Sequence, residues 1–133
     1  MTVTDLGKDD IKATVLVAFA VRYKWFGVGS DNSPEVVTDT DLGNPIEVWE
    51  GSRVYRKEVD SVFTDGENII WVCRIGQGEF NKSGIDVNIN EIGIFNAQSG
   101  GTMILRKVLP ATLIKNNSKE YVVLVKLKLW EVV

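Results

Sequence analysis

Residues 121–129 (YVVLVKLKL) carry the pattern that most restricts what this chain can fold into. The odd-numbered positions are all apolar, and an extended strand places alternate side chains on the same face. The two lysines fall on the opposite face, together with Val122 and Leu124. This period-two alternation predicts a β-strand with one buried face. The two apolar residues on the second face indicate that the first half of the strand is covered on both sides.

Other stretches show the same period. Residues 85–90 (IDVNIN) alternate in the same way and the phase then changes at Glu91, so we expect a β-bulge near Asn90–Glu91. Residues 96–101 (NAQSGG) predict a hairpin turn, and residues 103–108 (MILRKV) the returning strand. A second hairpin is predicted between residues 52–62 and 68–75. The Asp65-Gly66 pair between them suits a turn that needs positive φ.

The N-terminal region is ambiguous. Residues 8–22 suit either a helix or a buried strand, because a continuous apolar run has no decisive period. The β-branched residues Thr14, Val15 and Val17 favour a strand. Residues 26–46 form the longest irregular stretch, and we expect a short helical turn to start at Thr38 or Asp39, whose side chains would cap it.

Short strands separated by turns at fairly regular spacing are typical of a β-sandwich or barrel. We therefore predict an all-β fold, a single-domain antiparallel β-sandwich or barrel over residues 1–133, with long loops and room for one short helix. The 133 residues suit one compact domain, and no interdomain linker or internal repeat divides them. Residues 1–12 are predicted to form an extended N-terminal arm.

Charge and composition exclude several function classes. The net charge of −3 argues against nucleic acid as the main partner, because phosphate binding relies on clustered Lys and Arg. No segment has the apolar length to span a bilayer, so we expect no membrane partner. Cys73 is the only cysteine, which excludes an intrachain disulfide and a cysteine-based zinc site. Its apolar neighbours predict a small buried side chain, and the chain suits a reducing compartment such as a cytoplasm.

The chain offers little for catalysis. It has no histidine, which removes the commonest general base and the usual serine triad. Asp39 and Asp41, with Asp31 nearby, have the chemistry of calcium ligands but lack the spacing of an EF-hand, so roles in turns and caps are favoured. Residues 27–30 (GVGS) lack the ending of a phosphate loop and are interpreted as a turn. We expect no catalytic residue, metal or cofactor.

Glu91 is the carboxylate of most interest. It lies in a strongly apolar strand beside the change of phase, and a buried carboxylate is costly unless it is paired. Catalysis by carboxylates needs a second, differently poised carboxylate, and the sequence identifies none. A structural ion pair with Arg106 or Lys115 is favoured, because Arg matches a carboxylate with two parallel hydrogen bonds.

Four tryptophans is a notable number for this length. Core packing is the favoured role, followed by a subunit interface and then by stacking on a sugar or base. The candidates for structural or interface roles are Trp25, Trp49, Glu91, Arg106, Lys115 and Trp130.

Two stretches of the chain resemble segments of known proteins in the spacing of their turn residues. Residues 25–46 (WFGVGSDNSPEVVTDTDLGNPI) contain an aromatic-Gly-x-Gly strand end, a polar loop and an Asp-Thr-x-Leu-Gly turn. Residues 89–115 (INEIGIFNAQSGGTMILRKVLPATLIK) combine Glu-x-Gly-Ile-Phe, a glycine turn, a return strand with Arg, then Pro and Lys. With the closing strand, this layout resembles virion structural proteins of tailed bacteriophages, of the tail-fibre, baseplate-collar or decoration type.

The resemblance implies a non-enzymatic virion protein that self-assembles and docks other particle components, such as a tail, collar, baseplate, fibre-adaptor or capsid-decoration subunit. Its partners would be copies of itself, with a trimer favoured, and other virion proteins, and assembly would occur in the host cytoplasm. Fibre proteins of this group are usually long, so a short adaptor, collar or decoration subunit is favoured. Residues 30–44 and 1–12 are expected to reach a neighbouring subunit.

Two alternatives remain open. The chain would be a carbohydrate- or ligand-binding β module if exposed tryptophans form a stacking platform. It would be a carboxylate-based hydrolase if Glu91 acts on a substrate, in which case Glu91→Gln abolishes activity.

Overall fold

The computed structural model describes residues 4–47, 56–81 and 85–128, and within them one helix and eight strands. In chain order these elements are α1 (Asp5–Arg22), β1 (Trp25–Gly29), β2 (Pro45–Ile46), β3 (Lys57–Glu58), β4 (Ser61–Asp65), β5 (Asn68–Ile75), β6 (Val87–Phe95), β7 (Met103–Lys115) and β8 (Tyr121–Lys128). The predicted predominance of strands is confirmed.

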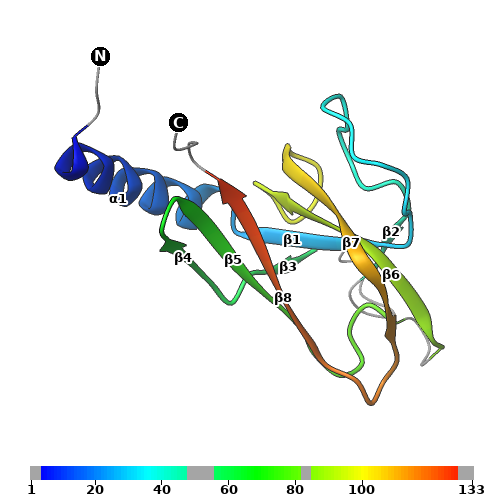
Figure 1. The fold of residues 1–133 in the computed structure, drawn as a ribbon. Helices are drawn as coiled ribbons and strands as arrows, with labels where there is room; N and C mark the ends of the chain where they lie inside the picture. Colours follow the sequence, from blue (N-terminus) through cyan, green and yellow to red (C-terminus); the bar gives the residue numbers. More distant parts are fainter. Residues whose placement is uncertain (1–3, 48–55, 82–84, 129–133) are drawn as a thin grey trace.

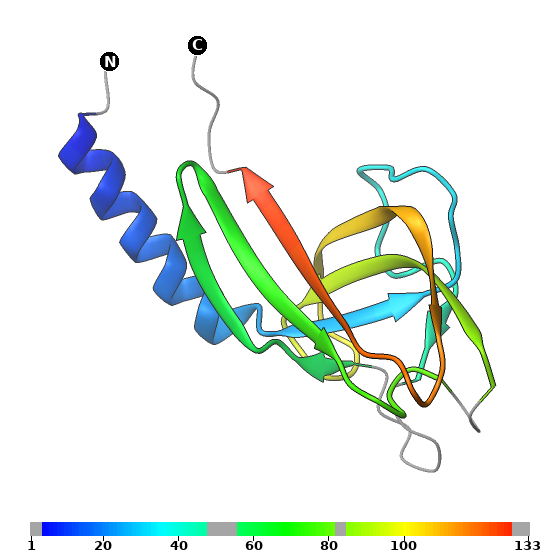
Figure 2. The same cartoon turned by 60° about the horizontal axis from the view of Figure 1, so that its bottom comes forward.

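The strands form two antiparallel sheets that pack face to face (Figure 1). The first has five strands in the order β2-β1-β6-β7, with β3 also paired to β1. The second has three strands in the order β4-β5-β8. The predicted all-β antiparallel sandwich is therefore confirmed. β7 ends one sheet and β8 ends the other, and the two strands diverge from their connecting loop (Figure 2).

The core lies between the sheets and is made of alternate residues from each. The five-stranded sheet contributes Phe26 and Ile92, and the three-stranded sheet contributes Trp71, Cys73 and Ile75, all fully buried. Inward-facing positions of a sandwich recur every second residue, so this core follows directly from the alternation in the sequence.

The N-terminal segment differs from the prediction. α1 runs from Asp5 to Arg22, so residues 5–12 are helical rather than an extended arm, and the strand favoured for residues 8–22 is wrong. Thr4 caps the helix by accepting a hydrogen bond from the Gly7 amide at 3.1 Å. Phe19 then stacks on Trp71, with ring centroids 5.7 Å apart. No helix in the described part of the chain has the length and apolar character to cross a membrane.

The local predictions for the strands are mostly confirmed. β4 and β5 form the expected hairpin, and Gly66 at its turn has φ of +59°. Its first strand is Ser61–Asp65 rather than the predicted residues 52–62, because Lys57–Glu58 pair with β1 instead. Residues 52–55 lie outside the described residues. The pairing of β6 with β7 shifts register between Ile89 and Glu91, where the bulge was predicted. The second face of β8 is the exception. Val122 and Leu124 are each 51% exposed, so this face lacks the predicted cover.

Candidate functional site

Glu91 lies at the centre of a buried hydrogen-bond network. Its side chain, on β6 just after the bulge, is fully buried. One carboxylate oxygen accepts from the amides of Asp31 (3.0 Å) and Asn44 (2.9 Å). The other accepts from the Gly43 amide (2.8 Å) and from Arg106 Nε (2.9 Å). Each oxygen thus has two donors, which is how a carboxylate is held in a protein interior without a large desolvation cost.

Arg106 completes this network from the neighbouring strand β7, and only 4% of its side chain is exposed. Its Nη1 group donates to Asp39 Oδ2 at 3.3 Å, and its Nη2 group donates to the Ser33 carbonyl at 3.0 Å and lies 3.5 Å from Asp31 Oδ2. Burial alone would lower the pKa of Arg106, but the hydrogen bond and charge of Glu91, together with Asp39, raise it. Of the two predicted partners of Glu91, Arg106 is therefore the one that binds it.

These contacts fix the long loop of residues 30–44 against the end of the five-stranded sheet. The loop closes through the Ser30 amide, which donates to the Asn44 carbonyl at 3.0 Å. Gly29 lies where the loop leaves β1, and a Cβ there would meet the Glu91 carboxylate and lie 2.6 Å from the Asn44 carbonyl oxygen. Glycine is required by this close approach. Residues 27–30, interpreted from the sequence as a turn, instead include the end of strand β1.

The tip of this loop is apolar and exposed. Val36 is 56% exposed and Val37 is fully exposed. Asp39 holds the tip in a tight turn, since its amide donates to the Val36 carbonyl and its carboxylate accepts from the Val36 amide, both at 3.0 Å. The helical turn predicted to start at Thr38 or Asp39 is replaced by this turn.

The three aspartates weighed as calcium ligands have other partners. Asp31 and Asp39 pair with Arg106, whereas Asp41 lies 4.0 Å from Arg56. Hydrogen bonds from the amide and hydroxyl of Ser33 hold the pKa of Asp31 below its ordinary value. Within residues 4–47, 56–81 and 85–128, no group of three or more acidic, cysteine or histidine side chains is placed to hold a metal ion.

Lys115 occupies a separate buried position at the end of β7. Its ammonium donates to Asn81 Oδ1 at 2.7 Å and to the Asn116 carbonyl at 2.8 Å. Burial lowers its pKa, against the opposing effect of Glu79 and Glu120. It pairs across the sheet with Val87 rather than with a residue of the Glu91 network, so it is not the ion-pair partner weighed from the sequence.

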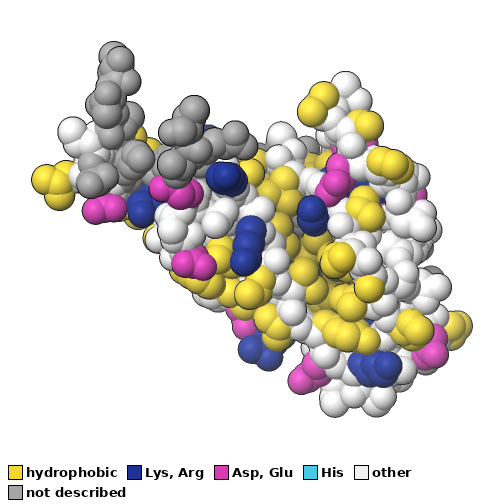
Figure 3. Space-filling view, in the orientation of Figure 1, with side chains coloured by type: hydrophobic (Ala, Val, Ile, Leu, Met, Phe, Trp, Pro, Cys, Tyr) yellow, Lys and Arg dark blue, Asp and Glu magenta, His cyan; other side chains and the backbone are white. Residues whose placement is uncertain are grey.

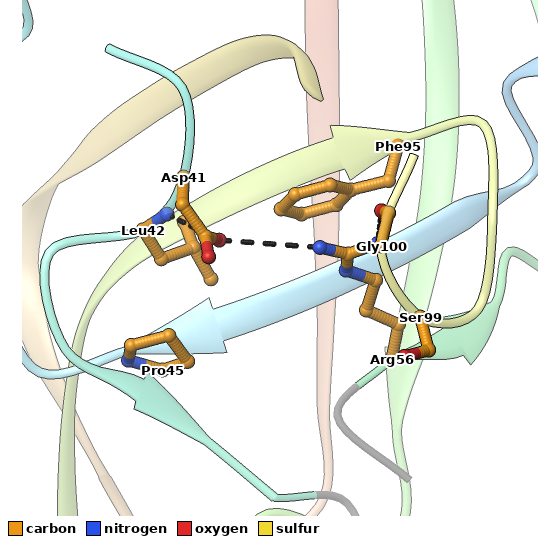
Figure 4. Close-up of a pocket in the computed structure, with 7 residues that line it drawn as sticks. All are labelled: Asp41, Leu42, Pro45, Arg56, Phe95, Ser99 and Gly100. Carbon is orange, nitrogen blue, oxygen red and sulfur yellow. Dashed lines mark hydrogen bonds and ion pairs between the residues drawn. The ribbon is translucent and has the colours of Figure 1, made fainter. Parts of the chain in front are cut away.

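A second polar cluster surrounds Arg56, a residue that the sequence did not single out. Arg56 is 8% exposed and borders a cavity of about 260 Å³ (Figure 4). Its guanidinium lies 3.4 Å from the ring centroid of Phe95 and donates to the Ala97 and Gly100 carbonyls. Burial lowers the pKa of Arg56, and the charge of Asp41 acts in the opposite direction. No local sequence pattern predicts that Arg56 is buried in a polar cluster, because its partners come from distant segments.

Neither of the two tryptophans that the structure describes is an exposed stacking platform. Trp71 is fully buried and donates its indole N–H to the Tyr23 carbonyl at 2.9 Å, which is the core role favoured from the sequence. Trp25 is half-buried at the start of β1. Trp49 and Trp130 lie outside the described residues.

Comparisons with protein-family models, with curated proteins and with solved structures returned no match.

Proposed function

We propose that this chain is a non-enzymatic structural subunit of a tailed-virus particle, which assembles with copies of itself in the host cytoplasm and docks other virion proteins. The observation that carries the proposal is the Glu91–Arg106 network, which holds a long loop rigidly while its tip presents two exposed valines. A buried network of this kind positions a binding element, because its members cannot move independently.

The network also explains the two stretches that resemble tailed-phage proteins. Residues 25–46 supply β1 and the loop, and residues 89–115 supply most of β6 and all of β7. β1 pairs with β6 along its whole length, and Glu91 from the second stretch accepts hydrogen bonds from Gly43 and Asn44 of the first. The residues that carry the resemblance therefore build one architectural unit. This supports a structural role for them.

The chemistry of the buried groups also supports a non-enzymatic role. A general acid or base must reach a substrate, and Glu91 is fully buried with two donors on each oxygen. Burial raises the pKa of the Cys73 thiol, which keeps it protonated and a poor nucleophile. These features favour the non-enzymatic proposal over the hydrolase alternative centred on Glu91.

The loop suggests what its partner looks like. Residues 30–44 include Asp31, Glu35, Asp39 and Asp41 but neither Lys nor Arg. Val36 and Val37 form the exposed apolar tip of this loop, which lies on the opposite side of the molecule from α1 (Figures 1 and 2). Apolar anchors with a charged rim are typical of protein interfaces. The four loop carboxylates already pair with Arg106, Arg56 and Lys107 of this chain. The docking surface on the neighbouring virion protein should therefore be an apolar pocket that receives the two valines.

The test is incorporation into particles. The tagged chain would be supplied to host cells that carry the virus with its own copy of the gene disrupted, and mass spectrometry of purified particles would measure its copy number. We expect a fixed copy number for the natural sequence and a loss of at least about tenfold for Val37→Asp, since a charge buried in an apolar pocket is costly. Thr40→Asp, at another exposed loop position, is the control. Absence of the natural chain from particles would overturn the proposal.

One observation favours a second function, a ligand-binding β module. The cavity beside Arg56 combines an aromatic ring, a guanidinium and a carboxylate, the groups that commonly orient small polar ligands such as sugars. Screening of a glycan array with the purified chain tests this alternative. Specific binding that is lost in Phe95→Ala but kept in Phe63→Ala would favour it over the structural proposal.

A further inference from the structure

β8 has one paired edge and one open edge. It pairs with β5 from Tyr121 to Lys128, and no strand among the described residues pairs with its other side. An open edge carries a row of free amide and carbonyl groups, which is a template for another strand. β7 ends the other sheet, but it contains the exposed Pro110, which has no N–H to donate. β8 contains no proline, so its edge suits pairing better than that of β7.

The surface around this edge is apolar. Val122 and Leu124, each 51% exposed, point outward from β8. A groove of about 290 Å³ lies between β8 and β7, lined by side chains such as Leu109, Leu113 and Val123. In the space-filling view, hydrophobic side chains form a band between these two strands (Figure 3). Exposed apolar surface beside an open edge marks a site for association.

We propose that β8 pairs antiparallel with β8 of a second copy, about a two-fold axis that passes midway between the two Val123 residues, to join the two three-stranded sheets into one of six strands. This inference rests on the proposed self-assembling function and names a two-fold contact by which it occurs, so two copies are expected in place of the trimer that the resemblance favours. A two-fold contact is self-complementary, so every interaction in it is made twice.

Charge selects this register. With Val123 opposite Val123, the exposed face places Val122 against Leu124 of the second copy and Glu120 against Lys126 of the second copy. Glu120, Lys126 and Lys128 are all exposed on one chain. A parallel pairing in register would set lysine against lysine, and directly opposed like charges are destabilising. A slip of one residue would turn the apolar set to the wrong face.

The neighbouring antiparallel register provides the strongest competitor. Centred on Leu124, it would place Glu120 opposite Lys128 and Val122 opposite Lys126 of the second copy. This arrangement keeps one kind of ion pair but sets an apolar side chain against an ammonium group on each side of the axis. The register centred on Val123 is favoured, because it pairs each exposed apolar side chain with another apolar side chain and pairs Glu120 with Lys126.

Charge reversal of the purified full chain tests the proposal, with native mass measured by light scattering over a range of concentrations. The natural chain should form a two-copy species. Lys126→Glu and Glu120→Lys should each weaken it by about thirtyfold, because a cross-strand ion pair becomes a like-charge pair at two places. A one-to-one mixture of the two variants should regain the two-copy mass, and so should the double variant. Lys128→Glu, opposite Ser118 of the second copy, is the matched control.

Cysteine cross-linking gives a second measurement that does not depend on charge. Val122→Cys and Leu124→Cys proteins should form a disulfide-linked pair when mixed under oxidising conditions, because directly opposed strand residues lie within disulfide reach. Each variant alone should cross-link far less. The native Cys73 is buried and does not interfere.

Three outcomes would overturn the inference: a one-copy mass at every concentration, a three-copy mass that the charge reversals leave unchanged, or failure of the mixed variants to restore association. None of these outcomes alters the particle-incorporation result. A chain found in particles without β8 pairing would retain the proposed function and lose this contact. A chain that pairs through β8 but is absent from particles would lose the proposed virion role.

Discussion

The buried Glu91 carboxylate has two donors on each oxygen, so replacing one of its oxygen atoms should be costly. Glu91→Gln keeps its shape but removes its charge and replaces one acceptor oxygen with an NH2 group, which would face donors. We expect the free energy of unfolding to fall by about 3 kcal/mol, because the change removes the nearest, fully buried one of the three carboxylates that pair with the buried Arg106 guanidinium. Urea denaturation measures it. Glu58→Gln, at an exposed pair 4.0 Å from Lys24, is the control, and equal small losses in both variants would contradict a structural role for the network.

The Glu91–Arg106 pair could be predicted from the sequence, but most of its surroundings could not. A carboxylate at an apolar strand position implies a cationic partner, and the hairpin after Phe95 brings β7 and its arginine alongside. The three loop amides that also bind Glu91 depend on the path of residues 30–44, for which no periodic pattern exists. Arg56 was missed for the same reason, since its carbonyl partners lie about forty residues away in sequence.

Lys115 should make stability depend on pH in the alkaline range. Burial lowers its pKa in the folded chain, so the unfolded chain holds this proton more tightly. Between the folded pKa and about 10.4, the unfolded state binds more protons, and the free energy of unfolding rises with pH. Below the folded pKa both states are protonated and the contribution is flat. Lys115→Met should remove the rise in urea denaturation curves, whereas the exposed Lys119→Met should keep it. Parallel curves for all three proteins would contradict this assignment.

At the scale of elements, α1 shows where sequence patterns mislead. The β-branched residues of the segment favoured a strand, yet intrinsic preferences are small beside tertiary packing. Val15, Leu16, Phe19 and Tyr23 follow helical spacing and pack against the core, so burial of this face decides the structure. The other face of α1 also carries apolar side chains such as Val17, and this second stripe obscured the helical period.

Phe19 should hold α1 on the three-stranded sheet. Its ring stacks on Trp71 at 5.7 Å and meets Tyr23 edge-on at 5.3 Å between centroids. Phe19→Ala should lower the free energy of unfolding by about 2–3 kcal/mol, through lost burial and aromatic contact, and should reduce the helical circular dichroism signal. Val17→Ala, at a position 66% exposed, should change either quantity little. Equal effects of the two substitutions would place the docking face of the helix elsewhere.

The hairpins were easier to predict because their determinants are local. Gly66, Gly100 and Gly101 all have positive φ, as tight turns between strands require, and each lies in a turn that the sequence marks. The uncovered outer face of β8 was not predictable in this way. Alternation indicates which side chains share a face. It does not indicate that β8 is an edge strand or that Val122 and Leu124 lack cover, because both depend on how distant segments are arranged.

For the molecule as a whole, the sandwich class follows from the strand period, whereas the split into five and three strands follows from long-range pairing such as β5 with β8. This split leaves two separate surfaces for association. The valine tip projects from the five-stranded sheet, and the open edge belongs to the three-stranded sheet (Figure 1). Two surfaces on different sheets allow a subunit to contact a second copy of itself and another protein at the same time.

Because the two surfaces share no residue, substitutions in them should separate two properties. Val37→Asp should keep the two-copy native mass but fail to enter particles. Lys126→Glu should lose the two-copy mass in dilute solution yet still enter particles, because docking through the loop tip raises the local concentration and restores weak pairing. Light scattering and mass spectrometry of purified particles measure the two properties on the same preparations. If each variant lost both properties, self-association and docking would depend on a single surface, and the division between the two sheets would be wrong.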